Sequence, residues 1–169
     1  MLKSSGAIYV AMSETSESET STEPLRLMAQ DAEDLAVLSA QMQDAVVRVG
    51  DMAWLPKVQR FALLACRFDW MAAEAGRRER CHTGLHFDCV RSARLRGFDQ
   101  SDPALTLNLL GIVFSPTDAP SGTVDLVFSG GAGVQLEVEC LEAQLRDLGS
   151  RWKTDRQPGH VPNDGPGEA

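Results

Sequence analysis

The stretch CHTGLHFDC, residues 81–89, carries two cysteines and two histidines within nine positions. These are the residue types that hold zinc, through thiolate sulfur and imidazole nitrogen. If residues 84–97 form one strand, His82 and His86 share a face but stand about 13 Å apart, and Cys81 and Cys89 stand about 26 Å apart. Zinc bonds of about 2.0–2.3 Å cannot gather such groups. Helical spacing would bring the histidines together, but Gly84 and the alternation of apolar residues favour a strand. The interpretation is therefore a strand with Leu85, Phe87 and Cys89 inward, without a metal site and without a bound cofactor.

Arginines offer a second candidate site. Guanidinium groups bind phosphate or carboxylate through paired hydrogen bonds. The candidate anion-binding residues are Arg67, Arg91, Arg94 and Arg96, with the loop residues Arg77 and Arg78 beside them. The alternative is that these arginines pair with acidic residues of the same domain. Residues 57–96 hold nine basic groups against four acids, and residues 97–150 hold eight acids against one arginine. This balance favours internal pairing.

Catalytic constellations are weakly represented. A nucleophile needs an adjacent base and an orienting group. Cys81 with His82 or His86 is the only local pair, and neighbours on a strand point to opposite faces. The run SGGAG, residues 129–133, lacks the lysine of a phosphate loop and connects two strands. No catalytic residue is predicted, and an enzyme is the least favoured class.

The elements that would position these residues fall between two polar ends. Residues 1–23 read as a disordered acidic tail and residues 153–169 as a disordered tail rich in proline and glycine, leaving a single globular domain over 24–152. Translation could begin at Met1 or at Met12. The apolar share of 43% suffices for a core.

The domain begins with a short strand candidate, residues 25–29, and an amphipathic helix from Asp31, an N-cap, with Leu35, Leu38, Met42 and Val46 on one stripe. Alternating segments follow: 46–56 broken by a Gly-Asp turn, 60–70 apolar on both sides and therefore central, 84–97, and 105–116. Residues 123–129 and 134–139 form a hairpin around GGAG, with Val124, Leu126 and Phe128 facing Val134, Leu136 and Val138. Leu141, Leu145 and Leu148 predict a closing helix capped by Gly149.

The predicted fold class is α+β: a mainly antiparallel, strongly curved sheet or small barrel of about seven strands, with one early helix and one C-terminal capping helix. Short connections exclude helical crossovers. The order of elements is similar to that of a pleckstrin-homology barrel.

The net charge of −8 argues against DNA and anionic membranes as partners. No run approaches the roughly 20 apolar residues of a membrane span, and no export segment is evident. The expected location is the cytoplasm, with reduced thiols.

The runs LRLMAQDAEDLAVLSAQMQDAVVRVGDMAWLPKVQRFALLACRFDW and GGAGVQLEVECLEAQLRDLG, with the following tryptophan, resemble a small bacterial domain-of-unknown-function family over about residues 24–153. The resemblance implies a compact cytoplasmic single-domain protein and no known activity, cofactor or catalytic residue. The N-terminal tail and the cysteines of CHTGLHFDC are outside the shared pattern. The favoured function is a non-enzymatic module that binds an unknown protein partner, and the alternative is a small-ligand or anion-binding domain.

Overall fold

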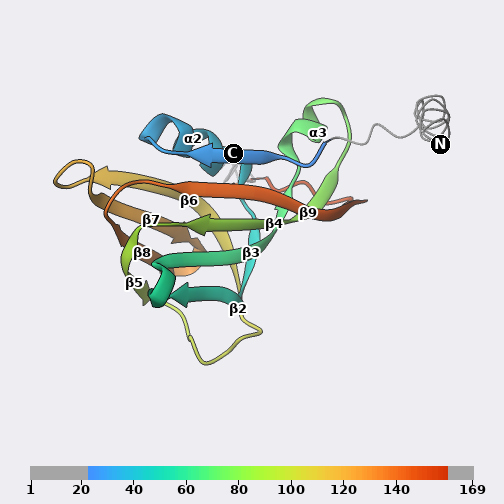
Figure 1. Cartoon of the computed structure of the whole chain (residues 1–169). Coiled ribbons are helices and arrows are strands. Elements are labelled where there is room, and N and C mark those ends of the chain that lie inside the picture. The colour runs from blue at the N-terminus through green and yellow to red at the C-terminus, as the bar shows by residue number, and fades with distance from the viewer. Residues whose placement is uncertain (1–22, 160–169) are drawn as a thin grey trace, which may run out of the picture.

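A computed structural model describes residues 23–159 of the chain. The expectations for the ends of the chain, including the choice between Met1 and Met12, lie largely outside the described residues. Within them the chain forms nine strands, two α-helices and two 3-10 turns (Figure 1). The elements are β1 (Arg26–Ala29), α2 (Ala32–Gln41), β2 (Val46–Leu55), η1 (Pro56–Val58), β3 (Arg60–Phe68), α3 (Trp70–Glu74), β4 (Glu79–Phe87), β5 (Val90–Arg96), β6 (Thr106–Pro116), β7 (Gly122–Phe128), η2 (Ser129–Gly131), β8 (Gly133–Val138) and β9 (Ala143–Lys153).

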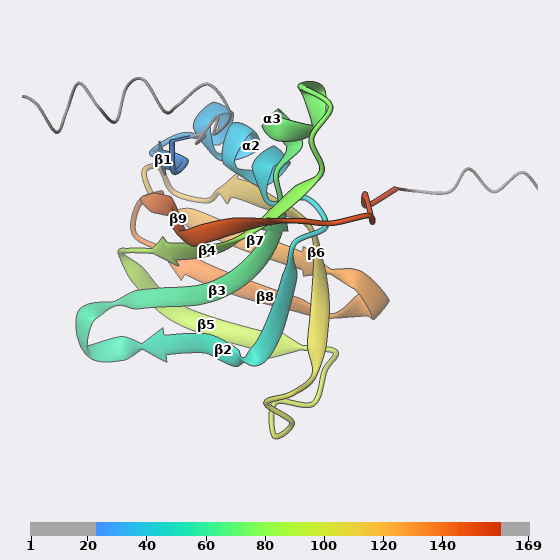
Figure 2. The ribbon, with the colours of Figure 1, turned by 90° about the vertical axis from the view of Figure 1, so that its right-hand side faces the viewer.

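All nine strands belong to one antiparallel sheet in the order β1-β9-β4-β3-β2-β6-β7-β8-β5. The prediction of a mainly antiparallel α+β fold is therefore confirmed. The prediction of about seven strands is wrong, since residues 23–159 form nine. Of the two predicted shapes, a strongly curved sheet or a small barrel, the barrel is wrong, because β1 and β5 form two unpaired edges of an open sheet. The sheet bends so that β3 and β4 lie across from β5 and β8 (Figure 2).

The core fills the space between the two halves of this bent sheet. Phe61 and Leu85 from one half and Leu126 and Leu136 from the other belong to a single buried cluster. Alternation along each strand sends every second side chain into this cluster. The predicted hairpin is confirmed, since Val124 lies opposite Leu136 in the β7–β8 pair.

Helix α2 begins and packs as its sequence predicts. The Asp31 side chain accepts a hydrogen bond of 2.8 Å from the Asp34 backbone N–H, and Leu35 and Leu38 are buried. The helix ends at Gln41, so Val46 belongs to β2 instead of the helical stripe. Helix α2 packs beside β1 and β6 (Figure 1). No helix within residues 23–159 is long and apolar enough to cross a membrane.

The predicted C-terminal helix is wrong, because residues 143–153 form strand β9. Leu141, Leu145 and Leu148 fit a helical stripe, but the buried residues of β9 are Ala143, Leu145 and Asp147, which repeat every second position. Strand β9 pairs with β1 on one side and β4 on the other. Backbone pairing on both sides decides the conformation of this ambiguous segment.

Two further strand predictions need correction. Residues 84–97 do not form one strand, because β4 ends at Phe87 and β5 starts at Val90 with Cys89 between them at a φ of 59°. The Gly50–Asp51 turn is absent, and β2 continues through it with a shift of register between Val47 and Met52. Gly50 is needed there for close approach, since a Cβ would lie 2.9 Å from the Pro103 Cβ.

Candidate functional site

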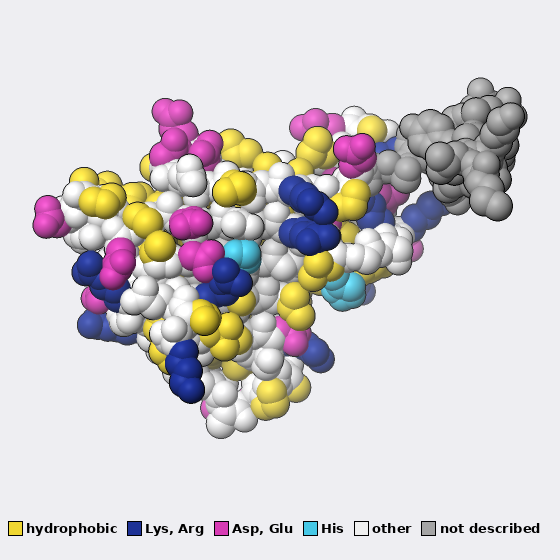
Figure 3. All heavy atoms as spheres, viewed as in Figure 1, with side chains coloured by type: hydrophobic (Ala, Val, Ile, Leu, Met, Phe, Trp, Pro, Cys, Tyr) yellow, Lys and Arg dark blue, Asp and Glu magenta, His cyan; other side chains and the backbone are white. Residues whose placement is uncertain are grey.

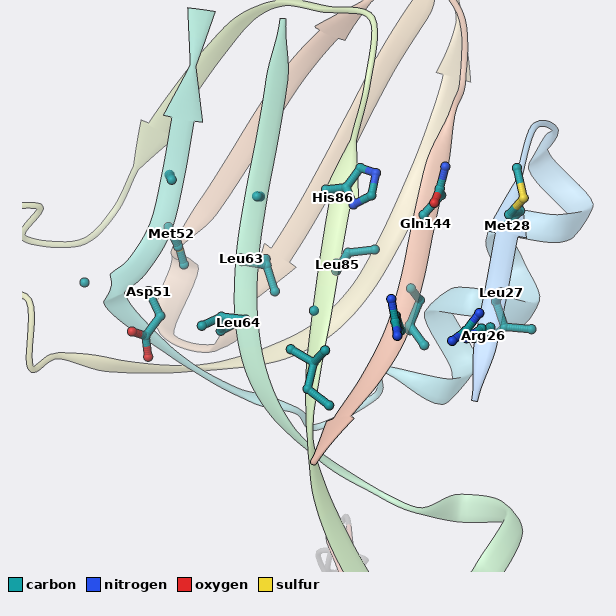
Figure 4. Close-up of a pocket in the computed structure, with 17 residues that line it drawn as sticks. Arg26, Leu27, Met28, Asp51, Met52, Leu63, Leu64, Leu85, His86 and Gln144 are labelled. Carbon is teal, nitrogen blue, oxygen red and sulfur yellow. The ribbon is translucent and has the colours of Figure 1, made fainter. Parts of the chain in front are cut away.

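The outer face of strands β1, β9, β4, β3 and β2 carries a shallow groove of about 750 Å³, which we call the outer groove. Figure 4 shows its labelled lining residues spread across these five strands, from Arg26 and Met28 on β1 to Asp51 on β2. Ligand-binding clefts usually measure about 300–1,000 Å³, so the volume is that of a binding site.

Small residues form the floor of the outer groove. Gly84 on β4 pairs with Leu64 on β3 and with Arg146 on β9, and the Leu148 Cδ1 lies 3.5 Å from the place of a Gly84 Cβ. A side chain at position 84 would therefore fill the hollow between these neighbours. Ala62 and Ala53 continue the small-residue floor toward β2.

The walls of the outer groove are apolar side chains exposed to solvent. Met28, Leu64 and Leu148 are 59%, 49% and 38% exposed. No element within residues 23–159 covers them, although the two-sided apolar pattern of β3 predicts burial on both faces. Figure 3 shows hydrophobic side chains on this face interspersed with basic, acidic and histidine side chains.

Two arginines stand at the β1 side of the outer groove. Arg26 and Arg146 lie directly opposite each other in the β1–β9 pair, and both are exposed. Among residues 23–159, neither has an acidic side chain within ion-pair distance. Like charges placed directly opposite on neighbouring strands destabilise a sheet. An anionic group bound between them would remove that repulsion.

A second hollow of about 570 Å³ adjoins the outer groove and shares Leu64, Leu148 and Asp51 with it. Asp51 is already paired with Arg48 at 2.9 Å. Farther along β9, Trp152 is 39% exposed and its ring centroid lies 4.9 Å from that of His82. The two hollows therefore adjoin each other, and Trp152 lies beside His82, which is part of the lining of the second hollow.

The four arginines predicted to bind an anion are not brought together by the structure. Arg67 is buried on β3, whereas the other three lie on the edge strand β5. Arg91 pairs with Glu139 at 3.3 Å, and Arg94 lies 3.8 Å from Glu137. Arg77, one of the loop residues, lies 3.7 Å from Glu79. These pairings agree with the alternative that the arginines pair with acidic residues of the same domain. Binding of an anion by the β5 arginines stays a prediction.

Arg67 takes part in a buried polar network centred on Asp147. Its Nε and Nη2 donate to the two Asp147 carboxylate oxygens at 2.8 and 2.7 Å. Thr83 Oγ1 donates to the same carboxylate, and the Leu25 backbone N–H donates to it at 3.0 Å. Burial opposes ionisation, but the hydrogen bonds from Arg67 and Thr83 hold the pKa of the Asp147 carboxyl below its ordinary value. Both oxygens of the Asp147 carboxylate accept hydrogen bonds from other parts of the chain, so the network serves to join strands.

Arg151 extends this network to the helix α3. It donates to Asp147 at 3.0 Å and forms an ion pair with Asp69, the N-cap of α3. Asp69 also accepts a hydrogen bond from the Ala72 backbone N–H at 3.0 Å. One chain of charges thus joins β3, β9 and α3 at one end of the molecule.

The side chains of CHTGLHFDC diverge along β4. Cys81 is buried in the interior, and burial raises the pKa of its thiol to about 12. His82 lies on the outer face against Trp152, and the His86 Nε2 lies 3.4 Å from the Asp88 carboxylate. Cys89 lies in the turn after β4. The structure therefore does not bring the four groups into one cluster.

Cys89 instead meets two residues that are distant in sequence. Its Sγ, the Cys140 Sγ and a Glu142 carboxylate oxygen lie within 4.8 Å of one another. Among the described residues, no other group of three potential metal ligands is this close. The sequence does not reveal this cluster, because residues 139–149 fit the predicted closing helix, which gives no reason to place Cys140 and Glu142 beside Cys89.

A model of one protein family matches residues 25–160 of the chain, and its description is a protein of unknown function (DUF2948). The chain belongs to the DUF2948 family. The resemblance inferred from the sequence over about residues 24–153 is thereby confirmed. No curated protein and no solved structure matches the chain.

The DUF2948 match covers every strand of the sheet, including β1 and β9 that carry Arg26 and Arg146. These two arginines were not among the sequence candidates. Both lie outside the basic stretch 57–96, in segments where acidic residues predominate. That they are neighbours becomes visible only when β1 pairs with β9.

Proposed function

We propose that this member of the DUF2948 family is a non-enzymatic binding module whose outer groove receives a segment of a partner protein. The segment would place an apolar side chain over Gly84 and a carboxylate between Arg26 and Arg146. The observation that carries the proposal is an opposed pair of arginines at the side of an apolar groove, with no acidic partner and no covering element among residues 23–159.

Charge and side-chain composition support a protein as the occupant. Protein interfaces are enriched in aromatic residues, methionine and arginine, and the surface offers Trp152, Met28 and the two arginines. A pocket for a small molecule usually encloses most of its ligand. The outer groove is shallow and continues into a second hollow, so its shape suits an extended partner better.

Site-specific photocrosslinking in the native cell tests this proposal. A photoreactive residue replaces Leu64, which lines the outer groove, or Val113 on β6, which is 55% exposed and not part of the groove lining. We expect a discrete crosslinked product from position 64 and none of that mass from position 113. Equal products from both positions would contradict the proposal.

Charge reversal then identifies the responsible arginines. The Arg26→Glu/Arg146→Glu variant should reduce the product at position 64 about tenfold, which corresponds to about 1.4 kcal/mol. The matched control is Arg94→Glu, which reverses an exposed arginine on β5. Loss of the product in the Arg94→Glu variant alone would assign binding to the β5 arginines instead.

A small anionic ligand is the second candidate, because the same arginine pair could bind phosphate or a carboxylate. Thermal denaturation with inorganic phosphate and with citrate separates the two candidates. Stabilisation of the wild type by either anion, absent in the Arg26→Glu/Arg146→Glu variant, would favour the small ligand.

A further inference from the structure

Two connections of the chain meet at the end of the sheet where β4 stops. One is the Asp88–Cys89 turn between β4 and β5, and the other is the loop 139–142 between β8 and β9. The Glu139 backbone N–H donates to the Cys89 carbonyl at 2.9 Å, and the Asp88 backbone N–H donates to the Glu142 carbonyl at 2.9 Å. These reciprocal hydrogen bonds fix one loop against the other, so their side chains are held in place by backbone.

Three potential metal ligands project from this double loop. The Cys89 Sγ lies 3.7 Å from the Glu142 Oε2, and the Cys140 Sγ lies within 4.8 Å of both atoms. Tetrahedral zinc with bonds of about 2.3 Å to sulfur and 2.1 Å to oxygen separates two ligands by roughly 3.6–3.8 Å. The observed separations therefore require only a small inward movement of side chains to bind an ion.

We propose that Cys89, Cys140 and Glu142 form a binding site for one thiophilic divalent cation, Zn²⁺, with a fourth coordination position open to water. Two thiolates select zinc over calcium or magnesium, which prefer oxygen ligands. All three residues are half-buried, so the ion can reach them from solvent.

The chemistry of the three groups fits a thiophilic cation. Two sulfur ligands and one carboxylate oxygen from a single cluster would bind one divalent ion together.

Neighbouring charged groups are engaged elsewhere. Asp88 binds the Arg60 Nε at 2.7 Å and lies 3.4 Å from His86. Glu139 pairs with Arg91. The protein ligands of the proposed site are therefore Cys89, Cys140 and Glu142 alone. A water molecule is the usual fourth ligand of zinc bound by three protein groups.

Cobalt substitution tests the site on the full-length chain after thiol reduction and tag removal. We expect stoichiometric Co²⁺ to give a thiolate-to-cobalt charge-transfer band and the intense visible bands of a tetrahedral site. Zinc should displace the cobalt and abolish both. Calorimetry should show one Zn²⁺ ion bound per chain.

Single variants assign the ligands. Cys89→Ser and Cys140→Ser should each abolish the charge-transfer intensity or reduce it by about half, and Glu142→Gln should weaken Zn²⁺ binding at least tenfold. Cys66→Ser, at a half-buried cysteine on β3 outside the cluster, is the matched control and should keep the full spectrum. Far-ultraviolet circular dichroism confirms that each variant is folded. A wild-type chain without a charge-transfer band at saturating Co²⁺, or a band unchanged in both cluster variants, would overturn the proposal.

Discussion

Charged residues inside the sheet are the main feature of this protein at the scale of single side chains. Arg67 and Asp147 are both nearly inaccessible to solvent, yet each is an alternate member of an otherwise apolar strand face. A buried charge is tolerated only when it is paired and hydrogen-bonded. The bidentate contact between the two residues, with Thr83 and Arg151 on the same carboxylate, meets that requirement.

Asp147→Asn should therefore destabilise the fold by about 3 kcal/mol or more, because it leaves Arg67 buried without its counter-charge. Urea denaturation followed by circular dichroism measures the change in the free energy of unfolding. Asp51→Asn is the matched control. It breaks an ion pair with Arg48, whose side chain is 63% exposed, and should cost far less stability than Asp147→Asn because water screens the pair.

The pH dependence of this difference follows from the lowered pKa of Asp147. In the native state this carboxylate stays ionised at pH values below its ordinary pKa of 3.8. As the pH falls, the unfolded chain therefore binds the proton at a higher pH than the native state does. Its stabilisation is complete above about pH 5 and decreases as the pH falls through the native pKa. The difference in stability between wild type and Asp147→Asn should therefore narrow in acid. A difference that widens toward low pH would contradict the assigned role.

At the scale of elements, turns and close approaches decide where strands begin and end. Gly97 follows β5 with a φ of 76°, a conformation that L-residues with side chains rarely adopt. A Cβ at this position would lie 2.5 Å from the Gly131 carbonyl oxygen. The chain that follows β5 therefore passes so close to Gly131 and Ala132, just before β8, that no side chain fits between them.

Gly97→Ala should destabilise the fold by about 2–4 kcal/mol, through the positive φ and the steric overlap together. Gly76→Ala supplies the matched control, since Gly76 has a φ of 81° and no atom within 4 Å of the added Cβ. That control should lose only about 1 kcal/mol. Equal losses in chemical denaturation would show that Gly97 does not approach Gly131 so closely.

Elements differ in how far their sequences specify them. Helix α2 has a capping aspartate, an apolar stripe and no competing pattern, so its start and its buried face were predicted from the sequence. The sequence of β9 fits both a helical and an alternating pattern. Asp147 is one of its buried residues, so its inward face does not look apolar in the sequence. Its strand conformation depends on β1 and β4, which are far away in sequence.

At the scale of the whole molecule, the sheet is long and bent but open. The first strand pairs with the last, and β5 at the other edge pairs with β8 alone. A free edge exposes unpaired backbone groups to water. The two halves of the sheet are held together through the shared core, since Phe61 and Val134 belong to the same buried cluster.

Amide hydrogen exchange should distinguish this open sheet from a closed one. Amides of β4, which has partners on both sides, should exchange slowly along its whole length. In β5 the amides should alternate, with those facing β8 protected and most of those facing the free edge exchanging rapidly. Heteronuclear NMR in deuterated water measures both sets. Uniform protection throughout β5 would indicate that its edge is paired.

Local patterns in the chain were enough to predict the antiparallel α+β class, the helix α2, the β7–β8 hairpin and membership of the family. These depend on periodicity, on capping and turn residues, and on runs of sequence that each lie within one segment. Three contacts became visible with the folded chain: Arg26 faces Arg146, Cys89 meets Cys140 and Glu142, and Arg67 is buried against Asp147. Each of these contacts joins residues 51 to 120 positions apart. Strand order and register bring such residues together, and neither can be read from the periodicity of a single segment.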